Sequence, residues 1–237
     1  MVIDKNLCFA TAASNALTWW LDQNSDNIDK FLIKNPYYKK AEELKAINYY
    51  NGQYDSGVYK HLLKQYAWRE TGYWSDILYD HFINGYKPKK GGGTNTSIED
   101  AEKLLKEGPE IVNGGFFYDV FGTNLLSTRR GYGWDYAGLG PWLKENILAG
   151  NSILLDYYVG RQSHMITVWG VEFNENGKLT GVFISDSDDQ KQYGMMRYRI
   201  VEHHGAPFLT TNTRGPGSVR VDSITTLSLG QKYWDEY

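Results

Sequence analysis

The chain has 237 residues and a formal net charge of −3, with 25 Lys and Arg against 28 Asp and Glu. This length can bury a sizeable core in one domain, and the charge gives no reason to expect nucleic acid or an anionic membrane as a partner. No apolar run approaches the length that crosses a bilayer, and the first residues do not read as an export signal. A single cysteine excludes an intrachain disulfide and leaves the redox compartment undetermined.

Cys8 lies near the start of the first predicted helix, which extends to about Trp20. Asn6 is a favourable N-cap and places Cys8 in the first turn, where the positive end of the helix dipole favours a thiolate. A cysteine hydrolase keeps its nucleophile in such a position, whereas the alternative is an ordinary buried cysteine. The residues that follow are small and predict a central, closely packed helix: Ala10, Ala12, Ala13, Ser14 and Ala16.

Helical patterns dominate the first half of the chain, and strand patterns dominate the second. The expected helices cover residues 26–34, 55–66, 77–83, 98–108 and 139–148, with a polar loop over 87–97 and an aromatic loop over 114–122. The expected strands cover residues 152–159, 164–173, 179–185, 195–201 and 223–228, with a hairpin turn over 174–178. Helices followed by an antiparallel sheet predict an α+β fold, and no linker suggests more than one domain.

The candidate acid–base residues lie at the ends of two neighbouring strands. His164 opens one strand, and Asp186, Ser187 and Asp188 follow the next. A hairpin turn over 174–178 brings these ends together, so the imidazole can meet a carboxylate. If the strand stays regular, Asp186 and Asp188 point to one face and Ser187 to the other. Cysteine, histidine and aspartate in this order match the papain-like plan, in which histidine deprotonates the thiol and the acid fixes its tautomer.

Other site motifs are weak. None of the five histidines belongs to a His-Glu-x-x-His motif, and there is no cysteine pair, so we expect no metal. We interpret His203 and His204 as the end of a strand. The glycines at 91–93 lack the lysine of a phosphate loop, and Gly131 and Gly133 lack the third glycine of a dinucleotide turn, so we expect no cofactor.

With these residues in place, the chain resembles the streptococcal immunoglobulin-degrading cysteine endopeptidases, the IdeS or Mac family. The shared motifs follow one another along nearly the whole chain. In order, they are Leu7-Cys8-x-Ala10-x-Ala12, Trp19-Trp20-Leu-Asp-Gln23-Asn24, Phe82-Ile-Asn-Gly-Tyr86, Gly114-Gly-x-Phe117, Asp119-Val-Phe121, Leu125-Leu-x-x-Arg129, His164-x-Ile-x-x-Trp169-Gly, Asp186-Ser-Asp188 and Thr226-Leu-Ser-Leu-Gly-Gln231.

The resemblance implies a papain-like fold with the nucleophile helix packed on the antiparallel sheet, secretion, and cleavage of immunoglobulin heavy chains near the hinge. It also implies the roles of four residues. Cys8 is the nucleophile and His164 is the general base and acid. Asp186 orients the histidine, and Asp188 is a second, supporting carboxylate. The resemblance leaves open whether the immunoglobulin partner is IgG or another class, and it does not determine the oligomeric state.

In that family, a lysine shortly before the nucleophile helps to form the oxyanion hole. The corresponding position precedes Met1, as do the family's N-terminal strand and export signal. We therefore expect a single papain-like catalytic domain over residues 1–237 that lacks the family's N-terminal segment. Without the lysine, the oxyanion hole relies on the Cys8 backbone N–H and another donor, and loss of one donor costs on the order of a hundredfold in rate.

Two other functions stay open. A papain-like peptidoglycan amidase or endopeptidase would use the same three residues on a cell-wall substrate, although aromatic segments such as 49–50 and 116–118 favour contact with a protein surface. A non-catalytic immunoglobulin-binding module would bind without turnover.

Overall fold

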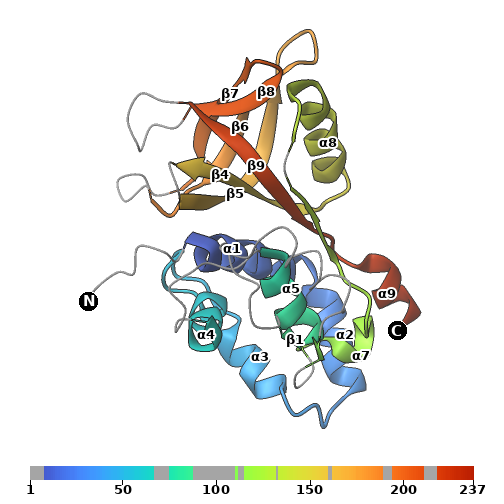
Figure 1. The fold of residues 1–237 in the computed structure, drawn as a ribbon. Coiled ribbons are helices and arrows are strands. Elements are labelled where there is room, and N and C mark those ends of the chain that lie inside the picture. Colours follow the sequence, from blue (N-terminus) through green and yellow to red (C-terminus); the bar gives the residue numbers. More distant parts are fainter. Residues whose placement is uncertain are drawn as a thin grey trace. The chain divides into compact units, whose positions relative to one another are not determined.

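The computed structural model describes residues 8–66, 75–87, 110–111, 115–131, 133–159, 162–188, 194–210 and 218–237 (Figure 1). The chain forms two compact units. A helical unit comprises residues 1–127 and 229–237, and a barrel unit comprises residues 128–228. Helices and an antiparallel sheet together confirm the α+β class. The expectation of one catalytic domain over 1–237 stays a prediction.

The helical unit contains most of the helices and one short hairpin. Its helices are α1 (Cys8–Gln23), α2 (Ser25–Lys34), α3 (Ala41–Ile47), α4 (Gly57–Tyr66), α5 (Ser75–Asn84), α7 (Tyr118–Phe121) and α9 (Gln231–Glu236). The hairpin pairs β1 (Tyr86–Lys87) with β2 (Glu110–Ile111). Helix α1 packs against α2, α4 and α5, and its small residues are buried, as expected for a central helix.

An aromatic cluster forms the other part of this unit's core. The Trp20 ring lies 5.3 Å from Phe117 and 6.3 Å from Trp234, measured between centroids, and Phe121 lies 5.1 Å from Trp234. The chain reaches this cluster through a close approach at Gly115, where a Cβ atom would lie 2.1 Å from the Ile83 carbonyl oxygen. Only glycine fits there, which explains the glycine at position 115.

The barrel unit is built from strands β3 (Ser127–Arg130), β4 (Ser152–Val159), β5 (Gln162–Phe173), β6 (Leu179–Ser185), β7 (Met196–His203), β8 (Ala206–Thr210) and β9 (Ser218–Leu227). The strand order is β3-β9-β4-β5-β6-β7-β8, and β9 also pairs with β8. Strands β4 to β9 therefore close into a six-stranded antiparallel barrel, with α8 (Tyr136–Leu148) packed against β4, β5 and β8. Side chains of Leu155, Ile166 and Tyr198 belong to its buried core.

Most predicted elements are confirmed within a few residues, including the turn over 174–178, where the Asn174 N–H donates to the Lys178 carbonyl oxygen. One expectation needs correction, because the segment 114–122 contains the short helix α7 where a loop was expected. The antiparallel sheet is closed, because β9 returns to pair with β8. His203 ends strand β7, as expected, and the turn to β8 follows it, with His204 at φ 49° and Gly205 at φ 75°. The predicted helix over 98–108 lies outside the described residues, as does most of the loop over 87–97.

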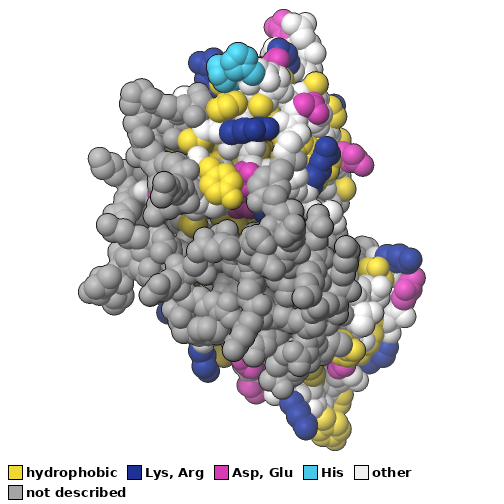
Figure 2. Space-filling view, viewed as in Figure 1, with side chains coloured by type: hydrophobic (Ala, Val, Ile, Leu, Met, Phe, Trp, Pro, Cys, Tyr) yellow, Lys and Arg dark blue, Asp and Glu magenta, His cyan; other side chains and the backbone are white. Residues whose placement is uncertain are grey.

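The expected elements did not include helices α3 and α9 or strands β1, β2, β3 and β8. Strand β8 is short and contains Pro207, which weakens the sequence pattern of a strand. Within the described residues, no helix combines the length and the apolar character needed to cross a membrane. On the part of the described surface visible in Figure 2, acidic, basic and hydrophobic side chains are interspersed, in keeping with the small net charge.

Candidate active site

Cys8 begins α1, the first helix of the helical unit. Its thiol forms no disulfide, and the residue is half-buried. Small, buried residues follow it on the same helix, among them Ala10 and Ala12. The predicted cap, Asn6, lies outside the described residues. Because Cys8 belongs to the helical unit and His164 to the barrel unit, a contact between them stays a prediction.

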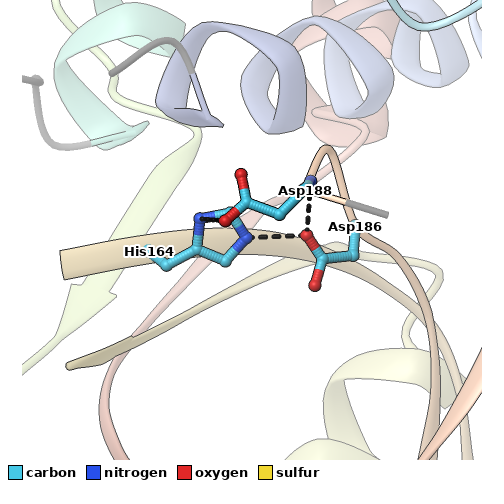
Figure 3. Close-up of side chains that lie close together, drawn as sticks. All are labelled: His164, Asp186 and Asp188. Atoms are coloured by element: carbon cyan, nitrogen blue, oxygen red, sulfur yellow. Dashed lines mark hydrogen bonds and ion pairs between the residues drawn. The ribbon is translucent and has the colours of Figure 1, made fainter. Parts of the chain in front are cut away.

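His164 lies near the start of β5, opposite Tyr157 of β4. Its side chain is buried and packs against the Tyr157 ring, with ring centroids 5.3 Å apart. The Nε2 atom of His164 lies 2.7 Å from Oδ1 of Asp186 (Figure 3). The β5–β6 hairpin thus brings the imidazole and a carboxylate into contact, as its turn predicted.

A turn, and not a continued strand, presents the two carboxylates. Strand β6 ends at Ser185, and the backbone N–H of Asp188 donates to Oδ1 of Asp186 at 2.8 Å. Oδ2 of Asp188 lies 3.7 Å from Nδ1 of His164 (Figure 3). Both acids reach one histidine, as expected, although the strand does not stay regular through 186–188, because the Asp186 side chain accepts a hydrogen bond from the backbone two residues on. Ser187, expected on the opposite face, is also buried.

Tyr198 is a further member of the site that sequence analysis did not single out. It lies on β7, is fully buried, and its hydroxyl donates to Oδ2 of Asp186 at 2.8 Å. The alternation of β7 marked this side chain as inward-facing, and a buried tyrosine hydroxyl needs a partner. The alternation alone does not predict that this partner is Asp186, because the pairing of β6 with β7 is what brings Tyr198 and Asp186 together.

Three donors surround the Asp186 carboxylate: the His164 ring, the Asp188 N–H and the Tyr198 hydroxyl. Burial is the largest single influence and raises the pKa of Asp186. The hydrogen bonds from these donors and the charge of His164 together outweigh it, and the pKa lies below its ordinary value. An ionised carboxylate only accepts hydrogen bonds, so Nε2 of His164 carries the shared proton and Nδ1 is the nitrogen that can accept one.

A β-bulge at Trp169 shapes β5 beside the site. The register of β5 against β6 shifts between Val168 and Gly170, and Nε1 of Trp169 donates to Oγ of Ser185 at 2.8 Å. This bond holds the last residue of β6, directly before Asp186. The site is therefore fixed by contacts between strands β4 to β7, and it combines a histidine, two carboxylates and a phenol. Its donor set also suits a metal ion, since ligand atoms of His164, Asp186 and Asp188 lie within 4.8 Å of one another.

Comparison with known proteins identifies the family. The family model described as Mac 1 matches residues 1–234. An IgM protease of Streptococcus suis (strain P1/7) is 37% identical over an alignment of 246 residues that covers 99% of this chain and 21% of that protein. The chain therefore spans about a fifth of the length of this relative. The match over nearly the whole chain confirms the resemblance in the sequence motifs: the chain belongs to the IdeS/Mac family.

Proposed function

We propose that the chain is the catalytic domain of a secreted cysteine endopeptidase that cleaves immunoglobulin heavy chains near the hinge and serves immune evasion. The observation that carries this proposal is the buried pair of His164 and Asp186, in a chain of the IdeS/Mac family. The name of the S. suis relative supports an immunoglobulin substrate and makes IgM the first class to test. A papain-like arrangement, with Cys8 facing His164, is part of the proposal.

In the first step, the Cys8 thiol gives its proton to Nδ1 of His164 and becomes a thiolate. The proton on Nε2 stays in the hydrogen bond to Asp186, which keeps the ring in the tautomer that presents a basic Nδ1. The carboxylate of Asp188, 3.7 Å from Nδ1, stabilises the imidazolium that forms. Tyr198 acts as a positioning residue, because its hydroxyl fixes the second oxygen of Asp186.

The thiolate then attacks the carbonyl carbon of the scissile peptide bond, and a C–S bond forms. As the C–N bond breaks, the imidazolium gives its Nδ1 proton to the leaving amine, which leaves a thioester on Cys8. His164 next takes a proton from water, the water oxygen attacks the thioester carbon, and the carboxylic product leaves as the thiolate returns. The Cys8 backbone N–H is one donor to the oxyanion of each tetrahedral intermediate.

The test is incubation with purified IgG and IgM at substoichiometric protein, followed by reducing gel analysis of the heavy chains. We expect a discrete heavy-chain fragment from at least one class, whose new N-terminus, read by sequencing, lies near the hinge or the corresponding region. Iodoacetamide treatment and a Cys8→Ser variant are the matched controls, and both should leave the heavy chain intact.

Each alternative function predicts a different result. Intact heavy chains at stoichiometric protein, together with retention on an immunoglobulin column, would support a binding module instead of a protease. Release of peptides from purified peptidoglycan without heavy-chain cleavage would support a cell-wall hydrolase. In either case the endopeptidase proposal is overturned for this chain.

A further inference from the structure

We propose that His164 and Asp188 form a zinc-binding pair at the end of the barrel, with Asp186 as the carboxylate that orients the histidine. The ligand atoms are Nδ1 of His164 and Oδ2 of Asp188, which lie 3.7 Å apart. Zinc–nitrogen and zinc–oxygen bonds of about 2.0–2.2 Å at tetrahedral angles place two ligand atoms roughly 3.4 Å apart. A small rotation of the Asp188 side chain therefore lets both atoms bind one ion.

The surroundings of His164 match those of a metal-binding histidine. A metal-ligating imidazole almost always donates its other N–H to a carboxylate or carbonyl, which fixes its tautomer and orientation. Here Nε2 lies 2.7 Å from Asp186, and Asp186 is in turn held by Tyr198 and by the backbone of Asp188. The tautomer that makes Nδ1 a proton acceptor also makes it a zinc ligand.

The charge and exposure of the pair favour a divalent cation. Two carboxylates flank one imidazole, and an imidazolium or a metal ion between them relieves their repulsion. The Asp188 side chain is 30% exposed and the His164 side chain 3%, so an ion can approach from solvent through the Asp188 carboxylate. Sequence motifs gave no zinc signature, because one ligand comes from β5 and the other from the turn after β6.

Zinc at this position would have a functional consequence that rests on the proposed function. An ion on Nδ1 occupies the nitrogen that exchanges protons with Cys8, so bound zinc would inhibit the endopeptidase reversibly. The binding itself does not depend on catalysis. It can be measured in a Cys8→Ser variant, in which the thiol contributes no ligand and no turnover takes place.

The experiment is a titration of ZnCl₂ into Cys8→Ser protein by calorimetry in a buffer that does not bind zinc. A matched NMR spectrum of the histidine ring nitrogens reports which nitrogen is bound. We expect one ion per chain and a shift of the His164 Nδ1 resonance. Adding Asp188→Asn or Asp186→Asn should weaken binding by about 10- to 100-fold, as for the loss of a ligand or of its orienting carboxylate. Circular dichroism checks that each variant is folded.

His203 and His204 provide the control, because their rings lie 4.2 Å apart in the β7–β8 turn and could bind zinc themselves. Replacing both by Ala should leave the affinity at His164 unchanged. Loss of binding in that variant, equal affinity of the Asp188→Asn protein, or no shift at His164 Nδ1 overturns the proposal. Zinc binding without any heavy-chain cleavage by the protein that retains Cys8 would reject only the proposed protease function.

Discussion

Two aspartates, the partly buried Asp80 of the helical unit and the buried Asp186 of the barrel unit, have pKa values shifted in opposite directions. Asp80, on α5 of the helical unit, accepts a hydrogen bond from the Ser127 hydroxyl at 2.7 Å. Burial and the nearby charge of Asp76 outweigh that bond and raise the pKa of Asp80 to about 7. Asp186, in the barrel unit, has three donors, and its pKa lies below the ordinary value despite burial.

The difference shows that burial does not decide whether a carboxyl group is charged. The Ser127 hydroxyl does not compensate the burial of Asp80, whereas a histidine, a backbone N–H and a phenol compensate that of Asp186. The barrel supplies these donors because neighbouring strands end close together. An ionised acid is what the proposed role of His164 needs, so the lowered pKa of Asp186 supports the proposed site at the barrel.

Asp186→Asn is expected to have the largest effect. The amide keeps the shape of the side chain but favours the wrong tautomer of His164, so kcat/KM for heavy-chain cleavage should fall by about 10⁴-fold. The measurement is the initial rate of cleavage against enzyme concentration. The matched control is Asp188→Asn, for which we expect a loss of about tenfold, since this carboxylate lies 3.7 Å from the ring. Equal losses in the two variants would contradict the assignment of Asp186 as the orienting residue.

Tyr198→Phe is expected to have an intermediate effect. It removes a hydrogen bond to a buried carboxylate and should cost about 1.5–3 kcal/mol of folding stability. Asp186 then loses a hydrogen-bond donor, so its pKa rises. When the solution is acidified, the stability contributed by the ionised Asp186 is therefore lost at a higher pH than in the unchanged protein. Urea unfolding between pH 3 and pH 7 measures both effects.

The matched control for Tyr198 is Tyr136→Phe in the same unit, since the buried Tyr136 hydroxyl donates to the Leu179 carbonyl oxygen. This variant should be destabilised without a change in cleavage rate, whereas Tyr198→Phe should also slow cleavage. If both variants slow cleavage equally, Tyr198 has only a structural role.

Asp80→Asn should stabilise the protein at pH 8 by about 1–2 kcal/mol. The amide stays neutral, whereas the Asp80 carboxylate is ionised at this pH in an environment that disfavours its charge. The native Asp80 carboxyl holds a proton that the unfolded chain releases between about pH 4 and pH 7, so its contribution to stability falls as pH rises through this window. The variant should lose that part of the pH dependence. Thermal unfolding at pH 5 and pH 8 tests this, and a larger gain at pH 5 would contradict it.

Ser127→Ala should have the smallest effect. It removes the hydroxyl that donates to Asp80, which raises the pKa of Asp80 further and costs about 0.5–1.5 kcal/mol of stability at pH 8. The same substitution in the Asp80→Asn background measures the coupling of the two side chains. No coupling in this double-mutant cycle would mean that the Ser127 bond does not stabilise the carboxylate.

The sequence alone determined most of the local structure and predicted the candidate site residues. Hydrophobic periodicity located α1 and strands β4 to β6, because each period reflects one face of one element. The hairpin turn over 174–178 was enough to bring His164 to the aspartates, since a hairpin relates residues close in sequence. The ordered motifs indicated the family, which the comparisons confirm.

Only the tertiary structure decided the barrel closure and the electrostatic environment of each acid. Closure depends on β9 returning to pair with β8, and the Tyr198 bond depends on the register between β6 and β7. Asp186 and Asp188 reach His164 through a turn that a strand pattern did not indicate. Asp80 and Asp186 are the same residue type, and they differ because ionisation depends on the donors and charges that the fold gathers around a carboxylate.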